Sequence, residues 1–269
     1  MIKNEGNMHA NLVKQVGLSS RQKFGRLVEF YLFSLAVLGR MFRFYRLKGQ
    51  NRTVLFRQIM FTGYDALLLI GFISISTSIL IVLEVNQIMG QLGKGRLVYD
   101  LLVVIVVQQL SSLFTALIVI ARSGTAIATE LGNMVVHNEI DLLNSFGISP
   151  LSYLVVPRVF GVIVALFTLT LYFNLLAVVG AAVFSDIAYH VDFNYFLGRY
   201  LKELSYSDFF MPVIKSLLFG LAVGLISCYQ GLRVERANTE VPQRTMHSVV
   251  YSVVSIILLN IAVTLVYFL

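Results

Sequence analysis

The sequence is poor in charged residues, and this shortage limits what the protein can be. Asp, Glu, Lys and Arg make up 13% of the 269 residues, whereas 57% are hydrophobic. A soluble domain carries about 25% charged residues, so this chain has too few to cover a soluble globule. A disordered chain is excluded as well, because disorder combines low hydrophobicity with high charge. The composition predicts an integral membrane protein.

Cysteine and the common nucleotide and metal motifs are also missing or nearly so. The one cysteine, Cys228, excludes a disulfide framework and a cysteine metal cluster. No G-x-x-x-x-G-K-[ST] string occurs, so ATP is not bound through a P-loop. His137, Glu139 and Asp141 are close in sequence, but residues two apart do not share a helix face. We therefore expect no metal and no cofactor on this chain.

Five hydrophobic segments are long enough, or nearly long enough, to cross a bilayer, which takes about 20 residues. The expected transmembrane helices cover residues 66–84, 100–121, 158–184, 211–230 and 248–268. The fold class is therefore an all-α integral membrane protein.

A sixth hydrophobic segment, residues 27–38, differs from the other five. It is about half a span long, contains Glu29 and is flanked on both sides by basic residues. This pattern indicates a helix of about residues 25–48 that lies in the membrane interface, or a short re-entrant elbow, rather than a crossing helix. Residues 1–24 are expected to be a basic tail, and residues 25–269 one membrane domain.

The distribution of Lys and Arg predicts the orientation. Residues 1–65 hold eleven of these residues, and with the N-terminus inside, the inner segments hold 16 against 5 outside. Positive charge marks the cytoplasmic side, so the N-terminus is expected in the cytoplasm and the C-terminus outside. The net charge of +7 then reflects a membrane surface rather than nucleic acid as partner.

Polar residues inside the spans are expected to serve packing. Lys215 should extend its stem toward the outer membrane surface, and pairing with an acid or a lipid phosphate is the alternative. Gly220 and Gly224 predict a close approach between helices. Four uncharged polar side chains are expected to form hydrogen bonds between helices, namely Gln108, Gln109, Asn174 and Asn260.

The connection between the second and third spans, residues 121–150, is the most informative stretch. Its apolar residues at helical spacing are Ile127, Leu131, Met134 and Val135. Glu130 falls on a different face, and Gly132 and Gly147 are candidates for breaking or capping helices. Composition alone leaves two interpretations open, a hairpin that packs beneath the bundle and a docking platform for a soluble partner.

This stretch resembles the signature of the MlaE-type permease family, the membrane subunits of lipid-transporting ABC systems. Members carry A-R-x-G-x-A-x-x-A-E-L-G-x-M, then E-x-D-A-L and P-x-x-x-L-V-x-P-R. The matching residues are Ala121, Arg122, Gly124, Ala126, Glu130, Leu131, Gly132, Met134, Glu139, Asp141, Leu143, Pro150, Leu154, Val155, Pro157 and Arg158. Further matches are Gln58, Gly63, Lys215, Ser216, Phe219, Cys228, Gly231, Thr245, Val249, Val250 and Ser252. The departures are Leu68, Ser78, Glu84 and the Glu240, Val241, Pro242 string.

The resemblance implies a homodimeric, multi-pass permease of the bacterial inner membrane with a periplasmic C-terminus. It implies that the chain is not an enzyme, and that a separate cytoplasmic ATPase binds ATP and Mg. It also implies periplasmic MCE-domain proteins as partners and a lipid, foremost a phospholipid, as substrate. Residues expected to couple to the ATPase are Arg122, Gly124, Glu130, Leu131, Gly132, Met134, Glu139 and Asp141. The segment around Glu130, between the second and third spans, would be a cytoplasmic coupling helix seated in a groove of the ATPase. Glu130 would contact this groove, and Arg122 and Arg158 would anchor the segment at the membrane.

A lipid pocket is expected between the first and fifth spans, at the dimer interface and open to the outer side. Its candidate residues are Ser74, Ser78, Leu80, Glu84, Gln109, Val253 and Asn260. An ion carrier would place Asp, Glu or His at mid-membrane, and these spans have none there. A membrane-embedded lipid enzyme of the acyltransferase kind and a non-transporting scaffold are the alternatives. Co-purification of a responsive ATPase would separate transport from both.

Overall fold

The computed structural model describes residue 25 and residues 28–41, 50–92, 102–204, 206–235 and 237–268. The chain divides into two compact units, residues 1–46 and residues 47–269. In the first unit residues 28–41 are helical, and Glu29 is exposed on this helix. The rest of the expected 25–48 helix lies mostly outside the described residues.

The second unit is a bundle of helices, and its described residues contain no β-strand. The elements are α2 (Gln50–Leu92), η1 (Leu102–Leu110), α4 (Ser111–Val119), η2 (Ile120–Gly124), α5 (Thr125–Val136), α6 (Glu139–Ser145), η3 (Leu151–Val155), α7 (Val156–Tyr189), α8 (Phe193–Glu203), α9 (Tyr206–Leu232) and α10 (Glu240–Phe268). Five stretches are long and apolar enough to cross a membrane, namely Thr62–Gln87, Ile105–Val136, Leu151–Tyr189, Asp208–Leu232 and Glu240–Tyr267. The all-α membrane fold is thereby confirmed.

The second span continues without a break into the helix that follows it. The backbone at Gly124 is right-handed helical, with φ −61° and ψ −45°, so η1, α4, η2 and α5 form one helical run. Residues 102–136 contain no proline that would end the helix. The π-helical turns η1 and η2 interrupt its regular hydrogen bonding without ending it.

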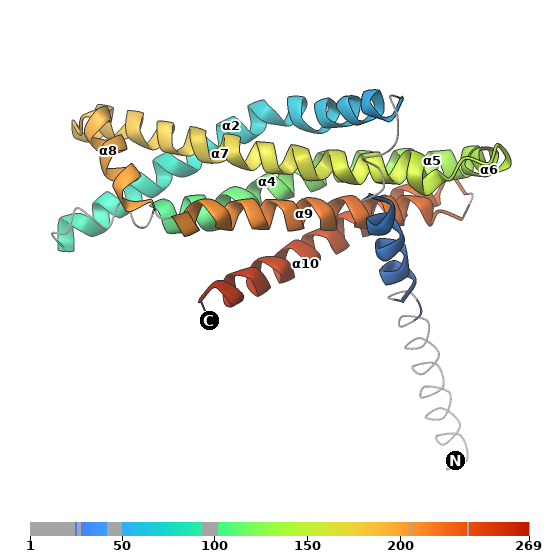
Figure 1. Ribbon diagram of the computed structural model, residues 1–269. Coiled ribbons are helices and arrows are strands. Elements are labelled where there is room, and N and C mark those ends of the chain that lie inside the picture. The colour runs from blue at the N-terminus through green and yellow to red at the C-terminus, as the bar shows by residue number, and fades with distance from the viewer. Residues whose placement is uncertain are drawn as a thin grey trace, which may run out of the picture. The chain divides into compact units, whose positions relative to one another are not determined.

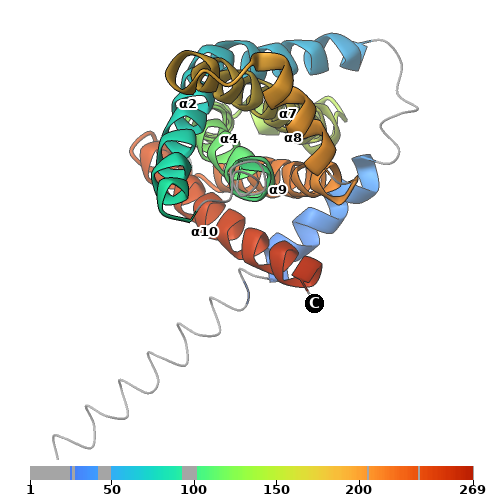
Figure 2. The same cartoon turned by 90° about the vertical axis from the view of Figure 1, so that its left-hand side faces the viewer.

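Within this unit α4 lies among the other long helices. Figure 2, which looks along the bundle, shows α4 surrounded by α2, α7, α9 and α10. The largest helix contacts join α2 to α7, α7 to α9 and α9 to α10. The core therefore forms around the second span and along α7 and α9.

Glycine brings α7 and α9 into backbone contact. A Cβ atom at Gly220 would lie 2.7 Å from Cα of Ile163, and one at Gly224 would lie 3.0 Å from Cα of Val159. At Gly220 a larger side chain would force a backbone to shift, and at Gly224 it would be tightly confined. The close helix approach predicted from these two glycines is confirmed.

Small residues also join α2 to α7. The hydroxyl of Ser74 donates a hydrogen bond of 2.6 Å to the carbonyl oxygen of Phe173. Ser78 is buried, and its Oγ would lie 2.9 Å from a Cβ added at Gly180. These two serines of the first span therefore face α7.

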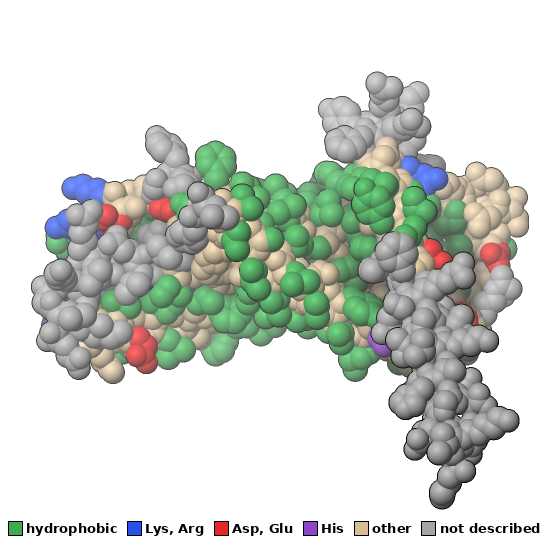
Figure 3. Space-filling view, turned by 90° about the horizontal axis from the view of Figure 1, so that it is seen from below, with side chains coloured by type: hydrophobic (Ala, Val, Ile, Leu, Met, Phe, Trp, Pro, Cys, Tyr) green, Lys and Arg blue, Asp and Glu red, His purple; other side chains and the backbone are tan. Residues whose placement is uncertain are grey.

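The two ends of the bundle carry different short helices. Figure 1 shows α5 and α6 together at one end, called the hairpin end here, and α8 at the opposite end. Hydrophobic side chains cover the middle of the face in Figure 3, and charged side chains gather toward its two ends. This distribution is the one that a membrane-spanning bundle requires, because charged groups are costly in the hydrocarbon core.

Candidate functional site

A helical hairpin, α5 and α6, projects at the hairpin end of the bundle. The turn between its helices is made at Asn138, whose φ of 59° is left-handed, a conformation that asparagine tolerates. Gly147 follows α6 with φ 72°, and the N–H of Ile148 donates to the carbonyl oxygen of Leu143 at 3.0 Å. This is a Schellman cap, so the expected capping role of Gly147 is confirmed.

Gly132 neither breaks nor caps a helix, in contrast to what its residue type suggested. It lies inside α5, where an added Cβ would be 3.0 Å from Cγ2 of Val234. One turn earlier on α5, the carbonyl oxygen of Ala128 would lie 2.7 Å from a Cβ added at Gly231 of α9. The two glycines let α5 pack directly against the end of α9 and the connection that follows it.

The tip of the hairpin exposes apolar side chains. Leu142, Phe146 and Ile148 are 58%, 71% and 41% exposed. Glu139 and Asp141 are exposed beside them, and α6 contains no buried residue. In the part of the chain that the structure describes, no group of His, Cys, Asp or Glu could hold a metal ion. The tip therefore presents an apolar surface with acidic groups at its edge.

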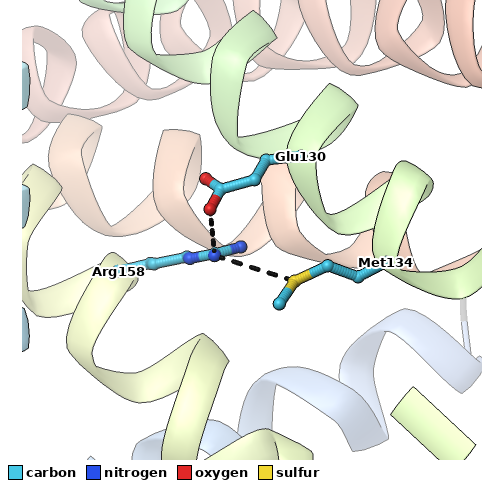
Figure 4. A network of polar contacts seen from close by, with 3 residues as sticks. All are labelled: Glu130, Met134 and Arg158. Carbon is cyan, nitrogen blue, oxygen red and sulfur yellow. Dashed lines mark hydrogen bonds and ion pairs between the residues drawn. The ribbon is translucent and has the colours of Figure 1, made fainter. Parts of the chain in front are cut away.

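Glu130 forms an ion pair within its own chain. Arg158 Nη2 lies 2.9 Å from Glu130 Oε1 and 4.0 Å from Met134 Sδ (Figure 4). The side chain of Arg158 is 8% exposed and that of Glu130 is 59% exposed. The sequence placed Arg158 at the membrane boundary as an anchor, and the structure shows which carboxylate it pairs with. A contact between Glu130 and an ATPase stays a prediction.

A second polar cluster surrounds Lys215 nearer the opposite end of the bundle. The ammonium donates to the carbonyl oxygen of Gln108 at 3.2 Å, to Gln109 Oε1 at 2.6 Å and to Thr264 Oγ1 at 3.0 Å. Lys215 is completely buried, so the expectation that its stem extends to the membrane surface is wrong. Three oxygen acceptors from η1 and α10 hold the charge inside the bundle, which offsets the cost of burying it.

Gln108 extends this cluster to a buried acid. Its Nε2 donates to Asp208 Oδ1 at 2.6 Å, so the expected hydrogen bonds of Gln108 and Gln109 between helices are confirmed. Asp208 also acts on α8, outside the spans. Burial, together with the negative charge of Asp208, raises the pKa of Tyr200 to about 12.

The other two amides in the spans do not show the expected hydrogen bonds. The Oδ1 atoms of Asn174 and Asn260 are buried, and among the described residues neither has a partner. A buried carbonyl oxygen without a partner is costly, so these two oxygens do not contribute the stabilising contacts between helices that were expected of them.

The candidate pocket residues fall into three groups in the monomer. Ser74 and Ser78 are buried against α7, and Gln109 belongs to the Lys215 cluster. Leu80 is 61% exposed, and Glu84 is exposed further along α2. On α10, Val253 and Asn260 are half-buried. Their role in lipid binding stays a prediction.

Two features of the site were missed by reasoning from the sequence. Asp208 stands at the start of the fourth span, seven residues before Lys215. That spacing, about two helical turns, is the signal that could have linked the acid to the lysine cluster. The apolar tip at Leu142 and Phe146 was visible in the sequence as large hydrophobic residues inside a polar connection.

Comparison with known proteins adds a family match and named relatives. The family described as "Permease MlaE" matches residues 55–266. "Protein TRIGALACTOSYLDIACYLGLYCEROL 1, chloroplastic" of Arabidopsis thaliana is 31% identical over 178 residues, which are 66% of this chain and 51% of that protein. A "Probable ABC transporter permease protein" of Rickettsia felis is 25% identical over 263 residues, 97% of this chain and 99% of that protein. This chain thus spans about half the length of the Arabidopsis relative and nearly all of the Rickettsia one.

Proposed function

Because the chain belongs to the MlaE permease family, we propose that it moves lipids, foremost phospholipids, between the bacterial inner membrane and periplasmic MCE-domain carriers. It is a multi-pass membrane permease of the ABC transporter kind. A second copy of the chain and a separate cytoplasmic ATPase, which binds ATP and Mg, complete the proposed transporter. The name of the Arabidopsis relative contains that of a lipid, trigalactosyldiacylglycerol, which supports a lipid substrate.

The observation that carries this proposal is the exposed hairpin tip. Large apolar side chains at the end of a bundle, outside its hydrophobic middle, mark a surface for a protein partner. Leu142 and Phe146 are the apolar centre of this surface, and Glu139 and Asp141 are its charged rim. The tip lies in the connection with the family signature, so we assign it to docking of the ATPase.

The proposed lipid pocket lies between the first and fifth spans at the interface of two copies. Support comes from the exposed apolar residues of α2 and α10, such as Leu80 and Leu258, which are both 61% exposed in the single chain. Ser78 is a poor site for probing this pocket, because a larger side chain there would disrupt the contact with Gly180. Leu80 offers an open position instead.

The proposal is tested by co-purifying the ATPase with the permease and measuring ATP-driven lipid transfer between proteoliposomes and a carrier protein. Replacing both Leu142 and Phe146 by serine should reduce ATPase retention by about tenfold or more, since losing one well-packed apolar anchor costs about 1–2 kcal/mol of binding. The matched control is Asn144→Ala, an exposed change on the same short helix. Wild-type retention by the serine variant would contradict docking at the tip, and ATP-independent transfer would contradict the transporter.

A further inference from the structure

We propose that Glu130 and Arg158 form the joint that fixes the hairpin to α7, so that Glu130 acts through Arg158 rather than by touching the ATPase. This inference rests on the proposed function, because it concerns how movement of the docked hairpin reaches the membrane spans. It assigns Glu130 a positioning role within the chain.

The ion pair joins α5 to α7, two helices between which the chain forms α6. Glu130 lies in α5 and Arg158 near the start of α7, 28 residues later. Their bond of 2.9 Å closes the loop that contains the hairpin tip. Figure 4 shows the guanidinium between Glu130 and Met134, with both α5 side chains directed toward it.

Burial makes this pair more than a surface contact. The Arg158 side chain is 8% exposed, and its Nη1 is buried without a partner among the described residues. A buried guanidinium needs a compensating charge, and removal of its carboxylate leaves it uncompensated. Arg158 therefore depends on Glu130, whereas the carboxylate itself is 59% exposed and has water as an alternative.

The remaining contacts of α5 lead to other helices. Thr129 shares a hydrogen bond of 2.9 Å with Thr245 of α10, and Ala128 lies against Gly231 of α9. The ion pair with Arg158 connects α5 to α7 as well. Because α7 continues from Arg158 through the bundle and packs against both α2 and α9, displacement of α5 at Glu130 is passed to the longest span.

A charge exchange provides the test, in the full permease with its ATPase. The single variants Glu130→Arg and Arg158→Glu each place like charges together, and the double variant restores an opposite pair in reversed order. Lipid transferred per ATP hydrolysed should fall on the order of tenfold in each single variant and recover in the double variant. ATPase retention should stay at the wild-type level in Glu130→Gln, which removes the charge alone.

A matched control comes from another acidic residue near the hairpin end. Glu235 and Arg244 form an ion pair of 3.6 Å with side chains 78% and 24% exposed. Exchange of these two charges should leave lipid transfer per ATP unchanged, because a pair at 3.6 Å with a largely exposed carboxylate contributes little.

Three results would overturn the inference. The first is loss of ATPase retention in Glu130→Gln. The second is a double variant that unfolds at the same temperature as the wild type but does not recover lipid transfer. The third is that the effects of the two single changes on thermal unfolding simply add up in the double variant. Thermal unfolding of the wild type, the two single variants and the double variant uses the purified permease alone. It therefore tests whether Glu130 and Arg158 interact even if no ATPase binds. Absence of ATPase binding to the wild type would instead contradict the proposed function.

Discussion

The close packing of α7 against α9 requires glycine at position 220, and a single substitution tests this requirement. An alanine Cβ would lie 2.7 Å from a backbone atom of α7, so Gly220→Ala forces the two helices apart. We expect a loss of about 1–3 kcal/mol in stability, the usual cost of overpacking a core. Thermal unfolding in detergent measures it.

The control for this change is Gly198→Ala on α8, where an added Cβ meets nothing within 4 Å. Alanine favours a helix over glycine by about 1 kcal/mol, so this variant should be as stable as the wild type or more so. Equal destabilisation by both variants would show that the α7–α9 contact is looser than described.

The raised pKa of Tyr200 predicts that the folded protein loses stability at alkaline pH. Its pKa is raised to about 12 in the folded chain from an ordinary value of 10.0. The folded state therefore holds the proton more tightly, and the associated stability is complete below about pH 10 and is lost as the pH rises toward 12. The loss should be on the order of 3 kcal/mol, because a difference of one in pKa corresponds to about 1.4 kcal/mol.

The measurement for Tyr200 compares unfolding of the wild type and Tyr200→Phe across this pH range. Phenylalanine does not ionise, so the variant should lose less stability between neutral and alkaline pH than the wild type does. Parallel pH curves for the two proteins would contradict a buried, tightly held phenolic proton.

At the scale of elements, hydropathy alone identified the five spans, because about 20 consecutive apolar residues have few alternatives to crossing a membrane. The ends of these helices were harder to predict. The second span was expected to end near residue 121 but continues to Val136, since Gly124 is helical in its packed surroundings. The helix α8 was not predicted, although Asp192 accepts hydrogen bonds from Asn194 N and Tyr195 N as a recognisable N-cap.

Thr264 gives a prediction for α10. It is the α10 residue that accepts a hydrogen bond from the buried ammonium of Lys215, at 3.0 Å. Thr264→Val keeps the shape of the side chain but removes this acceptor, so we expect a loss of about 1–3 kcal/mol, as for other bonds to buried charges. The loss is measured by thermal unfolding in nanodiscs.

Thr168→Val is the comparison for Thr264. Thr168 is exposed, and its hydroxyl donates a hydrogen bond to the carbonyl oxygen of Val164 in its own helix. This change should alter stability by less than about 0.5 kcal/mol. A similar cost for both variants would mean that the link from Lys215 to α10 contributes nothing of its own.

At the scale of the whole molecule, the orientation proposed from Lys and Arg is open to direct labelling. The single native cysteine, Cys228, is buried and should give no background. Asn144→Cys at the hairpin tip should react with a membrane-impermeant reagent only from the cytoplasmic side, and Asn194→Cys on α8 only from the periplasmic side. Labelling of both from the same side would refute the arrangement of the spans.

Sequence reasoning found the hairpin connection but not its internal contacts. Of the four apolar residues that helical spacing placed on one face, Ile127 and Leu131 are buried, whereas Met134 and Val135 are half-buried. The partner of Glu130 lies 28 residues away, and that of Lys215 lies on another span. Such pairs are set by how the helices pack, which one sequence does not specify.

The glycine contacts between α7 and α9 also bear on which parts of the protein can move. Backbones that touch directly have no intervening side chains to change rotamer, so these two helices should keep their separation throughout a transport cycle. Within the most apolar part of the stretch Glu240–Tyr267, 11% of the residues are buried, the lowest share among the five candidate spans. We therefore expect α7 and α9 to move together as one rigid unit during the cycle, whereas α10 keeps an exposed face that can change its contacts.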